Sequence, residues 1–220
     1  MVKRRENVLP VEAKIPEEKV SKEQAILEAA EQEFLDKGLE AAKTTTIASS
    51  AGVTHAMLHY YYRTKENLFD KVFEMKVSLL KDSLFTSFDN PGMPFLEKMQ
   101  CGIESHFDFI RAHPGLPRFV INELLFKPKR LKLFESKIKK GVDCVIAKIS
   151  EDMEEEVRKG TVNRIDPATL IIDVVSLNVF VFVAMPLLRT FAFEPYGTED
   201  AFFEARKKEN VEIMMRRLKK

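Results

Sequence analysis

The sequence predicts an all-α protein, and three observations lead to this prediction. Only eight of the 220 residues are glycine, and runs of alternating β-branched residues, which strands favour, are few. Apolar residues recur instead at helical spacing, as in the series Ile26, Leu27, Ala30 and Phe34. Proline and glycine separate such segments along the chain, so we expect consecutive helices joined by short turns.

The helices can be placed in order along the chain. Residues 1–20 carry many charges and two prolines but little periodicity, so we expect a flexible N-terminal arm. Ser21 and Gln24 then form a capping box, and Gly38 is expected to end the first helix as a left-handed C-cap. The predicted helices cover about 22–37, 47–50, 54–60, 65–83, 94–111, 116–125, 129–158, 167–190 and 198–218. We therefore expect three regions, which are the arm (1–20), a small three-helix domain (21–66) and a larger helical domain (67–220).

The overall composition favours a cytoplasmic protein, and its net charge does not by itself indicate a nucleic-acid partner. Lysine and arginine total 35 and aspartate and glutamate total 34, so any basic surface must be local. Cys101 and Cys144 are widely spaced and form no metal-binding or redox motif, which suits a reducing compartment. No apolar stretch with a cleavage site follows the basic first residues, so no secretory signal is expected.

One apolar run, from Leu170 to Leu188, is about as long as a membrane span. It contains Asp173 and Pro186, and an aspartate inside a span is energetically costly. We therefore expect a buried helix with apolar neighbours on more than one side, and no membrane partner.

Two short helices joined by a glycine turn are predicted in the small domain. Thr44, Thr45 and Thr46 offer hydroxyl caps for the helix that runs to about Ser50, and Thr54 offers one for the next. Gly52 lies in the intervening turn, where a positive φ would strain any side chain. This geometry is the one that places a second helix in the major groove of DNA.

The charge pattern around this turn agrees with a DNA-facing surface. From Ala41 to Lys65 the chain contains no aspartate or glutamate, although 34 acids occur overall. An acid at the contact would repel the phosphate backbone. The same window supplies hydrogen-bond donors suited to phosphates and base edges, which are Lys43, His55, His59, Tyr60, Tyr61, Tyr62, Arg63 and Lys65.

The residues of the small domain follow a pattern known from a protein family. The residues Ile26 to Ala30, then Phe34, Gly38, Ile47-Ala48, Ala51-Gly52-Val53 and the stretch LHYYYRTKENL from Leu58 to Leu68 resemble the DNA-binding domain of the tetracycline-repressor (TetR) family. The resemblance covers about residues 22–70. Two positions depart from the family pattern, because His59 stands where tyrosine is usual and Tyr62 where phenylalanine is usual.

We assign roles to the residues of the small domain accordingly. Thr54, His55 and Ala56 begin the helix expected in the major groove, where base edges are read. Thr44, Thr45, Tyr60, Tyr61 and Lys65 are expected to hold phosphates, and His59 to make a weaker or pH-dependent phosphate contact. Tyr62 is expected to pack in the core. The resemblance implies a homodimer, a palindromic double-stranded operator, and release from DNA when a small molecule binds within about residues 94–190.

The dimer is predicted to form through the two last long helices. The helix over 167–190 is apolar nearly all round, so one side needs a partner beyond the chain's own core. The helix over 198–218 is amphipathic, and two such helices from each subunit would form a four-helix interface, as in the family. The expected interface residues are Val175, Val179, Phe182, Val183, Val211 and Met214.

Other functions remain as alternatives. An enzyme would need a catalytic constellation, and no nucleophile elbow, phosphate-cradling loop or metal-ligand cluster is found, so no catalytic residue or cofactor is expected. His55 and His59 are spaced as a metal pair, but no third ligand lies nearby in the sequence. A DNA-binding protein of the same fold without an inducer, and an activator in place of a repressor, both stay open.

Overall fold

A computed structural model describes residues 22–88, 90 and 92–220, and the predicted arm and the Ser21 cap lie outside these residues. The all-α fold is confirmed, since the described residues form helices and no strand. Two short turns of other helix types accompany the α-helices, which are a π turn (η1) and a 3-10 turn (η2). In chain order the elements are α1 (Lys22–Ala41), α2 (Thr44–Ser50), α3 (His55–Tyr62), α4 (Lys65–Phe88), α5 (Phe95–Ala112), α6 (Leu116–Val120), η1 (Ile121–Leu125), α7 (Pro128–Lys159), α8 (Pro167–Val183), α9 (Met185–Leu188), η2 (Glu194–Tyr196) and α10 (Glu199–Leu218).

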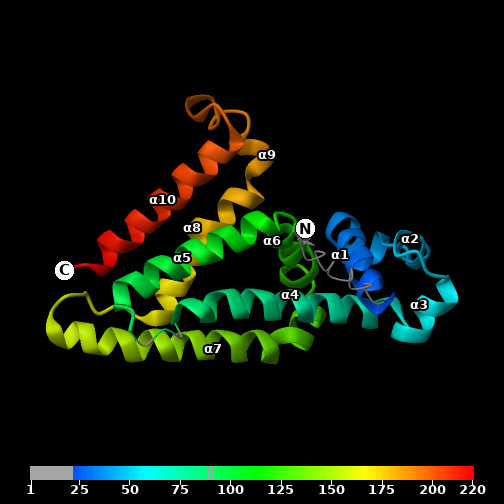
Figure 1. The fold of residues 1–220 in the computed structure, drawn as a ribbon, viewed down its shortest axis with the longest axis horizontal. Coiled ribbons are helices and arrows are strands. Elements are labelled where there is room, and N and C mark those ends of the chain that lie inside the picture. Colours follow the sequence, from blue (N-terminus) through cyan, green and yellow to red (C-terminus); the bar gives the residue numbers. More distant parts are fainter. Residues whose placement is uncertain (1–21, 89, 91) are drawn as a thin grey trace, which may run out of the picture.

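The first three helices lie together at one end of the molecule, and α4 runs from them into the larger part (Figure 1). Their core is formed by Phe34, Ile47 and Leu58, which are almost fully buried. Phe69 of α4 packs edge-on against Phe34, with ring centroids 5.2 Å apart. The same apolar cluster continues to Phe119 of α6, so α4 and α6 share the core of the small domain. The boundary between residues 66 and 67 stays a prediction.

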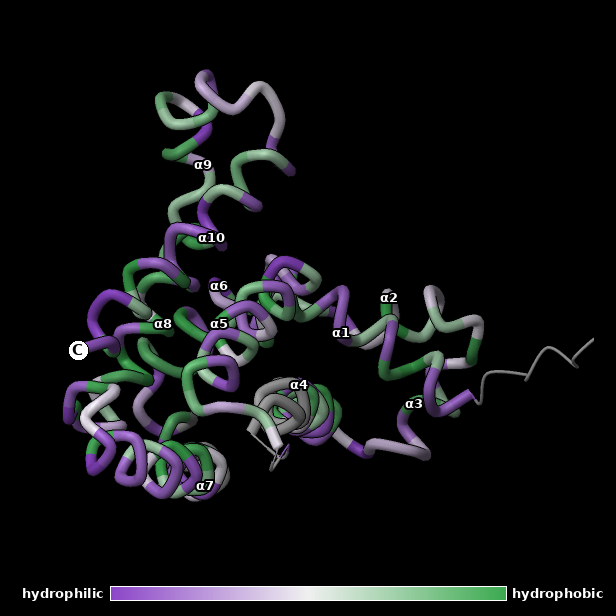
Figure 2. The backbone as a smooth tube through the Cα atoms, turned by 60° about the vertical axis from the view of Figure 1, so that its left-hand side comes forward, coloured by the Kyte–Doolittle hydropathy of each residue, from purple (hydrophilic) through white to green (hydrophobic). Residues whose placement is uncertain are grey.

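The larger part is a bundle in which α5, α8 and α10 pack on one another and α7 runs alongside α4 (Figure 1). Hydrophobic and hydrophilic residues alternate along the turns of α7 (Figure 2), as expected for a helix with one buried side. Ile103 of α5, Leu170 of α8 and Met214 of α10 meet in one of its cores. Phe107, Phe182 and Phe203 meet in another, where the rings of Phe182 and Phe203 stack with centroids 5.1 Å apart.

Helix boundaries differ from the sequence prediction at several places, including the ends of α1, α6 and α8. Gly38 has the expected positive φ of 71°, but its ψ of 172° lies outside the left-handed helical region, and the chain then makes one further turn to Ala41. The helix expected over 116–125 is α-helical only to Val120 and continues as the π turn η1. The helix expected over 167–190 ends at Val183, because Pro186 lacks an N–H and its ring would clash with the carbonyl of the preceding turn.

The polar residue inside the long apolar run has a partner within the chain. Asp173 of α8 forms an ion pair with Arg217 of α10. None of the helices in the described ranges combines the length and the apolar character that a membrane crossing requires.

Candidate functional site

The turn between α2 and α3 has the predicted geometry. Gly52 has a φ of 66°, and its N–H donates to the carbonyl of Ser49 at 3.1 Å. The N–H of Val53 donates to the carbonyl of Ala48 at 3.0 Å, which closes the turn over a small buried residue. A Cβ on Gly52 would meet no atom within 4 Å, so the backbone conformation alone selects glycine here.

The second helix of the pair, α3, presents one buried and one exposed side. Thr54 caps it as predicted, because its hydroxyl accepts a hydrogen bond of 3.2 Å from the N–H of Met57. Leu58 points into the core, whereas the predicted DNA-facing residues of α3 and its cap are exposed. Those exposed residues are Thr54, His55, Ala56, His59, Tyr60 and Tyr61. Their role in binding stays a prediction.

The helix α2 is joined to α3 by a side-chain contact. The hydroxyl of Thr44 and Nε2 of His55 form a hydrogen bond of 2.9 Å between the first turns of the two helices. The predicted threonine cap is replaced, since α2 begins at Thr44 and is preceded by Lys43, whose side chain makes no capping bond. The N–H of Lys43 instead donates to the buried carboxylate of Glu33 at 3.1 Å.

The buried carboxylate of Glu33 lies close to the predicted DNA-binding surface of α2 and α3. Burial alone would raise the pKa of Glu33, but hydrogen bonds from Lys37 and from the Lys43 N–H hold this pKa below its ordinary value. The carboxylate is turned inward and is buried, so it lies away from the exposed side of α3. A shallow polar depression of about 420 Å³ lies over α2 and α3, lined among others by Thr45, His55, Arg63 and Lys65.

Lys65 has a structural task that the sequence did not reveal. Its Nζ donates to the carbonyls of Glu40 at 3.1 Å and Ala42 at 3.0 Å, at the end of α1. These carbonyls carry the negative end of the helix dipole, so the ammonium stabilises that terminus. An ammonium has three protons, so one remains for a phosphate, and the predicted phosphate contact stays a prediction.

The three consecutive tyrosines divide between surface and core. Tyr60 is 72% exposed and Tyr61 is 42% exposed, whereas Tyr62 is buried, as expected for a residue in a core position. The hydroxyl of Tyr62 is buried without a hydrogen-bond partner among the described residues, and this burial raises its pKa to about 12. An unpartnered hydroxyl is what remains when tyrosine occupies a position suited to phenylalanine.

Directly after the tyrosines the backbone is strained. Arg63 has a φ of 64° and a ψ of −54°, and the N–H of Thr64 donates to the carbonyl of Tyr62 at 2.7 Å. These values describe a γ-turn with positive φ, which is uncommon for a residue with a side chain. The turn leaves Arg63 exposed beside α3, and its expected role as a donor to phosphates stays a prediction. Sequence patterns gave no sign of this conformation.

The residues predicted for the dimer interface fall into two groups. Val175 and Val183 are about two-fifths exposed on α8, and Val179 between them is partly buried. A correction applies to the other three, because α10 packs against α8 within the same chain and takes up that side of the helix. Phe182, Val211 and Met214 are buried there, in the chain's own core. Other exposed apolar residues of these helices are Ile172 and Phe180 of α8, Leu187 of α9 and Ile213 of α10.

A cavity of about 290 Å³ lies in the larger part of the molecule. Its walls come from α4 to α8 and are almost wholly apolar, for example Val77, Ile103 and Leu170. The range predicted to contain the pocket, 94–190, is therefore too short, since α4 also contributes Phe73 and Lys76. Side chains on different helices formed this cavity, and no local sequence pattern marks them.

Two polar side chains line the cavity. Lys76 is buried and its Nζ lies 2.5 Å from a carboxylate oxygen of Glu31. His106 is 5% exposed, and burial lowers the pKa of its imidazole to about 4, so the ring is neutral near pH 7. Within the described ranges no three histidine, cysteine, aspartate or glutamate side chains lie together as a metal site would require.

The glycine turn, the capped and exposed α3 and the acid-free surface define a helix-turn-helix DNA-binding protein. Residues 26–72 match the model of the family described as bacterial regulatory proteins, tetR family. Within residues 26–72 the chain therefore carries the helix-turn-helix domain of this family of regulatory proteins.

Comparisons with known proteins agree with this assignment. The transcriptional regulator YhgD of Bacillus subtilis is 24% identical over 135 residues, which are 56% of this chain and 70% of that protein. The transcriptional activator FasR of Mycolicibacterium smegmatis is 27% identical over 139 residues, 61% of each chain. The solved structure of the ketosteroid transcriptional regulator KstR2 of Mycobacterium tuberculosis superimposes with a TM-score of 0.65 at 18% identity, covering 91% of this chain and 96% of that one. At this identity the likeness concerns the fold.

Proposed function

We propose that this regulator is a repressor that binds a palindromic operator as a homodimer and leaves it when a small molecule fills the cavity. The observation that carries the proposal is a physical connection between cavity and DNA-binding domain. Leu124 of η1 lines the cavity, and the adjacent Glu123 accepts a hydrogen bond from the N–H of Leu39 in α1. A ligand that displaces η1 therefore acts directly on the helix that supports α2 and α3.

The exposed side of α3 supports the DNA-binding part of the proposal. Thr54, His55 and Ala56 begin the helix and are exposed, so they can reach base edges when α3 enters the major groove. Tyr60, Tyr61 and the free proton of Lys65 lie at the other end, where phosphates pass. Thr44 and Thr45 at the start of α2 are the remaining phosphate contacts, and His59 is a weaker one.

The exposed apolar stripe on α8 supports the dimer. Ile172, Phe180 and Val183 are exposed on α8, and Val179 lies partly buried between Phe180 and the core. A contiguous apolar stripe of this kind indicates a protein surface that is covered in solution. In the proposed two-fold dimer through α8 and α10, the two α3 helices lie on one side of the assembly. Two α3 helices arranged in this way would bind DNA half-sites that are one helical turn apart, about 34 Å.

The activator alternative has one observation in its favour, since FasR is named an activator. A test begins with an operator selected from a pool of randomised duplexes with the full-length protein. The selected duplex is then placed upstream or downstream of a promoter in a reporter assay. Repression is expected, and it should be relieved by a compound that binds the cavity. Increased transcription would favour the activator, and repression that no cavity ligand relieves would favour a protein without an inducer.

A further inference from the structure

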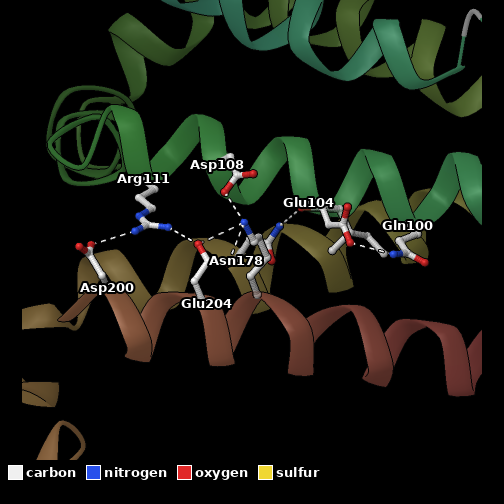
Figure 3. Close-up of polar contacts among 9 residues, drawn as sticks. Gln100, Glu104, Asp108, Arg111, Asn178, Asp200 and Glu204 are labelled. Carbon is white, nitrogen blue, oxygen red and sulfur yellow. Dashed lines mark hydrogen bonds and ion pairs between the residues drawn. The ribbon is translucent and has the colours of Figure 1, made fainter. Parts of the chain in front are cut away.

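A chain of buried hydrogen bonds connects the cavity to the surface of α10. Arg206 donates to the Oδ1 of Asn210 at 2.9 Å, and Asn210 donates through Nδ2 to the Oδ1 of Asn178 at 2.9 Å. Asn178 in turn bonds through Nδ2 to Nδ1 of His106 at 3.1 Å. Figure 3 shows Asn178 lying between α5 and α10, beside the surface ion pairs of Arg111.

The direction of this chain is fixed by its first member. A guanidinium can only donate, so Asn210 must turn its carbonyl oxygen toward Arg206 and its NH₂ toward Asn178. Asn178 then turns its own NH₂ toward His106. The Nδ1 atom of His106 must accept, and the proton of the neutral imidazole is therefore on Nε2.

The backbone holds both amides in this orientation. The second proton of Asn210 is donated to the carbonyl of Leu177 at 3.1 Å, and the second proton of Asn178 to the carbonyl of Ile103 at 3.0 Å. Both asparagine side chains are fully buried, so a flip of either one would leave donors facing donors in a buried site. The tautomer of His106 is thus imposed by three helices.

The Nε2–H group of the imidazole is the one that can bind a molecule in the cavity. His106 lines the cavity, and its Nε2–H has no hydrogen-bond partner among the described residues. This donor is in the lining of an almost wholly apolar cavity, so a molecule in the cavity gains a hydrogen bond by supplying an oxygen at this position. The rest of the wall is apolar apart from Lys76, which Glu31 already engages.

The charges around the cavity disfavour an anion. The ammonium of Lys76 and the carboxylate of Glu31 cancel, and burial keeps His106 neutral. A carboxylate entering this space would lose its hydration without meeting an uncommitted cation within the described part of the wall. The volume of about 290 Å³ is roughly twice the ~150 Å³ of a cavity that accommodates benzene, so a ligand on the order of ten non-hydrogen atoms fits.

We infer that the effector is an uncharged molecule with an apolar body and one carbonyl-type oxygen, as in a ketone, ester or lactone, and that this oxygen accepts the hydrogen bond of His106 Nε2–H. This inference rests on the proposed function, since it names the ligand class of the same cavity. His106 is the binding residue, and Asn178 is a positioning residue that fixes its tautomer.

The test measures the affinity of the full-length protein for two probes of equal chain length, 2-nonanone and nonanoate, by titration calorimetry at pH 7. The ketone should bind at least about 10-fold more tightly than the carboxylate, because only the carboxylate must lose a charge's hydration. His106→Phe should weaken ketone binding by roughly 5–10-fold, the usual effect of one lost hydrogen bond. His106→Gln keeps a donor and an acceptor, so its affinity for the ketone should lie between those of the wild type and His106→Phe. His113 lies outside the cavity lining, so His113→Phe should bind the ketone as the wild type does.

A second measurement begins with the wild-type protein, so its main result does not require that any variant folds. Nitrogen NMR of the histidine-labelled wild type should show His106 protonated on Nε2, and the signal of that nitrogen should move when 2-nonanone is added. Asn178→Leu should release the tautomer, which a merely structural residue would not do. A proton on Nδ1 in the wild type would overturn the inference.

The inference and the proposed function can fail separately. Equal or tighter binding of nonanoate, unchanged ketone affinity in His106→Phe, or no ketone binding at its solubility limit would each overturn the ligand class. If the ketone binds as expected but leaves the affinity for the selected operator unchanged, the ligand class stands and the proposed release from DNA is wrong.

Discussion

The carboxylate of Glu123 accepts a hydrogen bond of 3.3 Å from the backbone N–H of Leu39, a residue 84 positions earlier in the chain. Glu123 is 4% exposed and is also paired with Lys127 at 3.1 Å. The contact needs Gly38, because a Cβ there would lie 2.6 Å from the same carboxylate oxygen. The end of α1 and the wall of the cavity are thereby held together by one buried group.

Substitution of Gly38 should therefore lower the free energy of unfolding by more than backbone strain alone would, because the new side chain also meets Glu123. Gly38→Ala meets the Glu123 carboxylate and must also adopt a φ of 71° with a ψ of 172°, a region populated almost only by glycine. We expect a loss of about 3 kcal/mol in the free energy of unfolding, measured in urea. Gly160→Ala is the matched control, since its φ is 78° but no atom lies within 4 Å of the added Cβ, and it should lose about 1 kcal/mol. Equal losses in the two variants would mean that the Glu123 contact is unimportant.

The buried imidazole predicts a pH dependence of stability. Burial lowers the folded pKa of His106 to about 4 from an ordinary value of 6.5. Between these values the unfolded state binds a proton that the folded state excludes, so stability is present above pH 6.5 and is lost as the pH falls toward 4. The expected loss between pH 6.5 and pH 5 is about 1.5 kcal/mol. Urea unfolding of His106→Gln should lack this part of the loss, and an identical pH profile in wild type and variant would show that His106 titrates normally.

The bond between Thr44 and His55 predicts how bases are read. His55→Ala should change the duplex sequence selected from a randomised pool, because the ring begins α3 and is held in place by Thr44 at 2.9 Å. Thr44→Val should change the selection less, since it frees the ring without removing it. Tyr61→Phe serves as the comparison, because it removes one phosphate hydrogen bond and should weaken binding to every sequence alike. Selection of the same duplex by His55→Ala and the wild type would show that His55 reads no base.

A charge on the apolar stripe of α8 should separate the subunits. Val183→Asp would bury an unpaired carboxylate between protomers at a cost of about 3–5 kcal/mol and yield monomers in sedimentation equilibrium. Leu79→Asp on α4 is the matched control, since the exposed fractions of Val183 and Leu79 are 37% and 44% and Leu79 is not among the cavity-lining residues, and it should leave the dimer intact. The Val183 variant should also lose operator affinity although α3 is unchanged. A wild type that sediments as a monomer would contradict the proposed dimer.

The parts of this structure that local sequence determines could be predicted. Gly52 and Thr54 mark the turn and the cap, because a positive φ and an N-terminal hydroxyl each restrict the residue type. Tyr62 could be assigned to the core from its place in the family pattern. These residues determine the local geometry of the helix-turn-helix, while its core also takes in Phe69 and Phe119.

The parts that depend on contacts between distant helices could not be predicted. A helix that is apolar nearly all round, such as α8, does not reveal which side meets its own α10, so Phe182 and Met214 were assigned to a partner although they lie in the core. The bonds of Lys65 to backbone carbonyls leave no trace in the sequence. The same holds for the π turn that carries Glu123, because no residue type requires it.

The central claim is that α2 and α3 bind DNA through phosphates and base edges. The most direct test is the affinity of the full-length protein for its selected duplex, measured by fluorescence anisotropy between 50 and 200 mM salt. If several phosphates per half-site are neutralised, the affinity should fall at least ~100-fold over this range. Lys65→Ala removes one contact from each half-site, so it should make the slope shallower by about 1.8 relative to the exposed control Lys71→Ala. Gly52→Val should abolish binding while the helical circular dichroism persists. An affinity that does not change with salt would contradict the account.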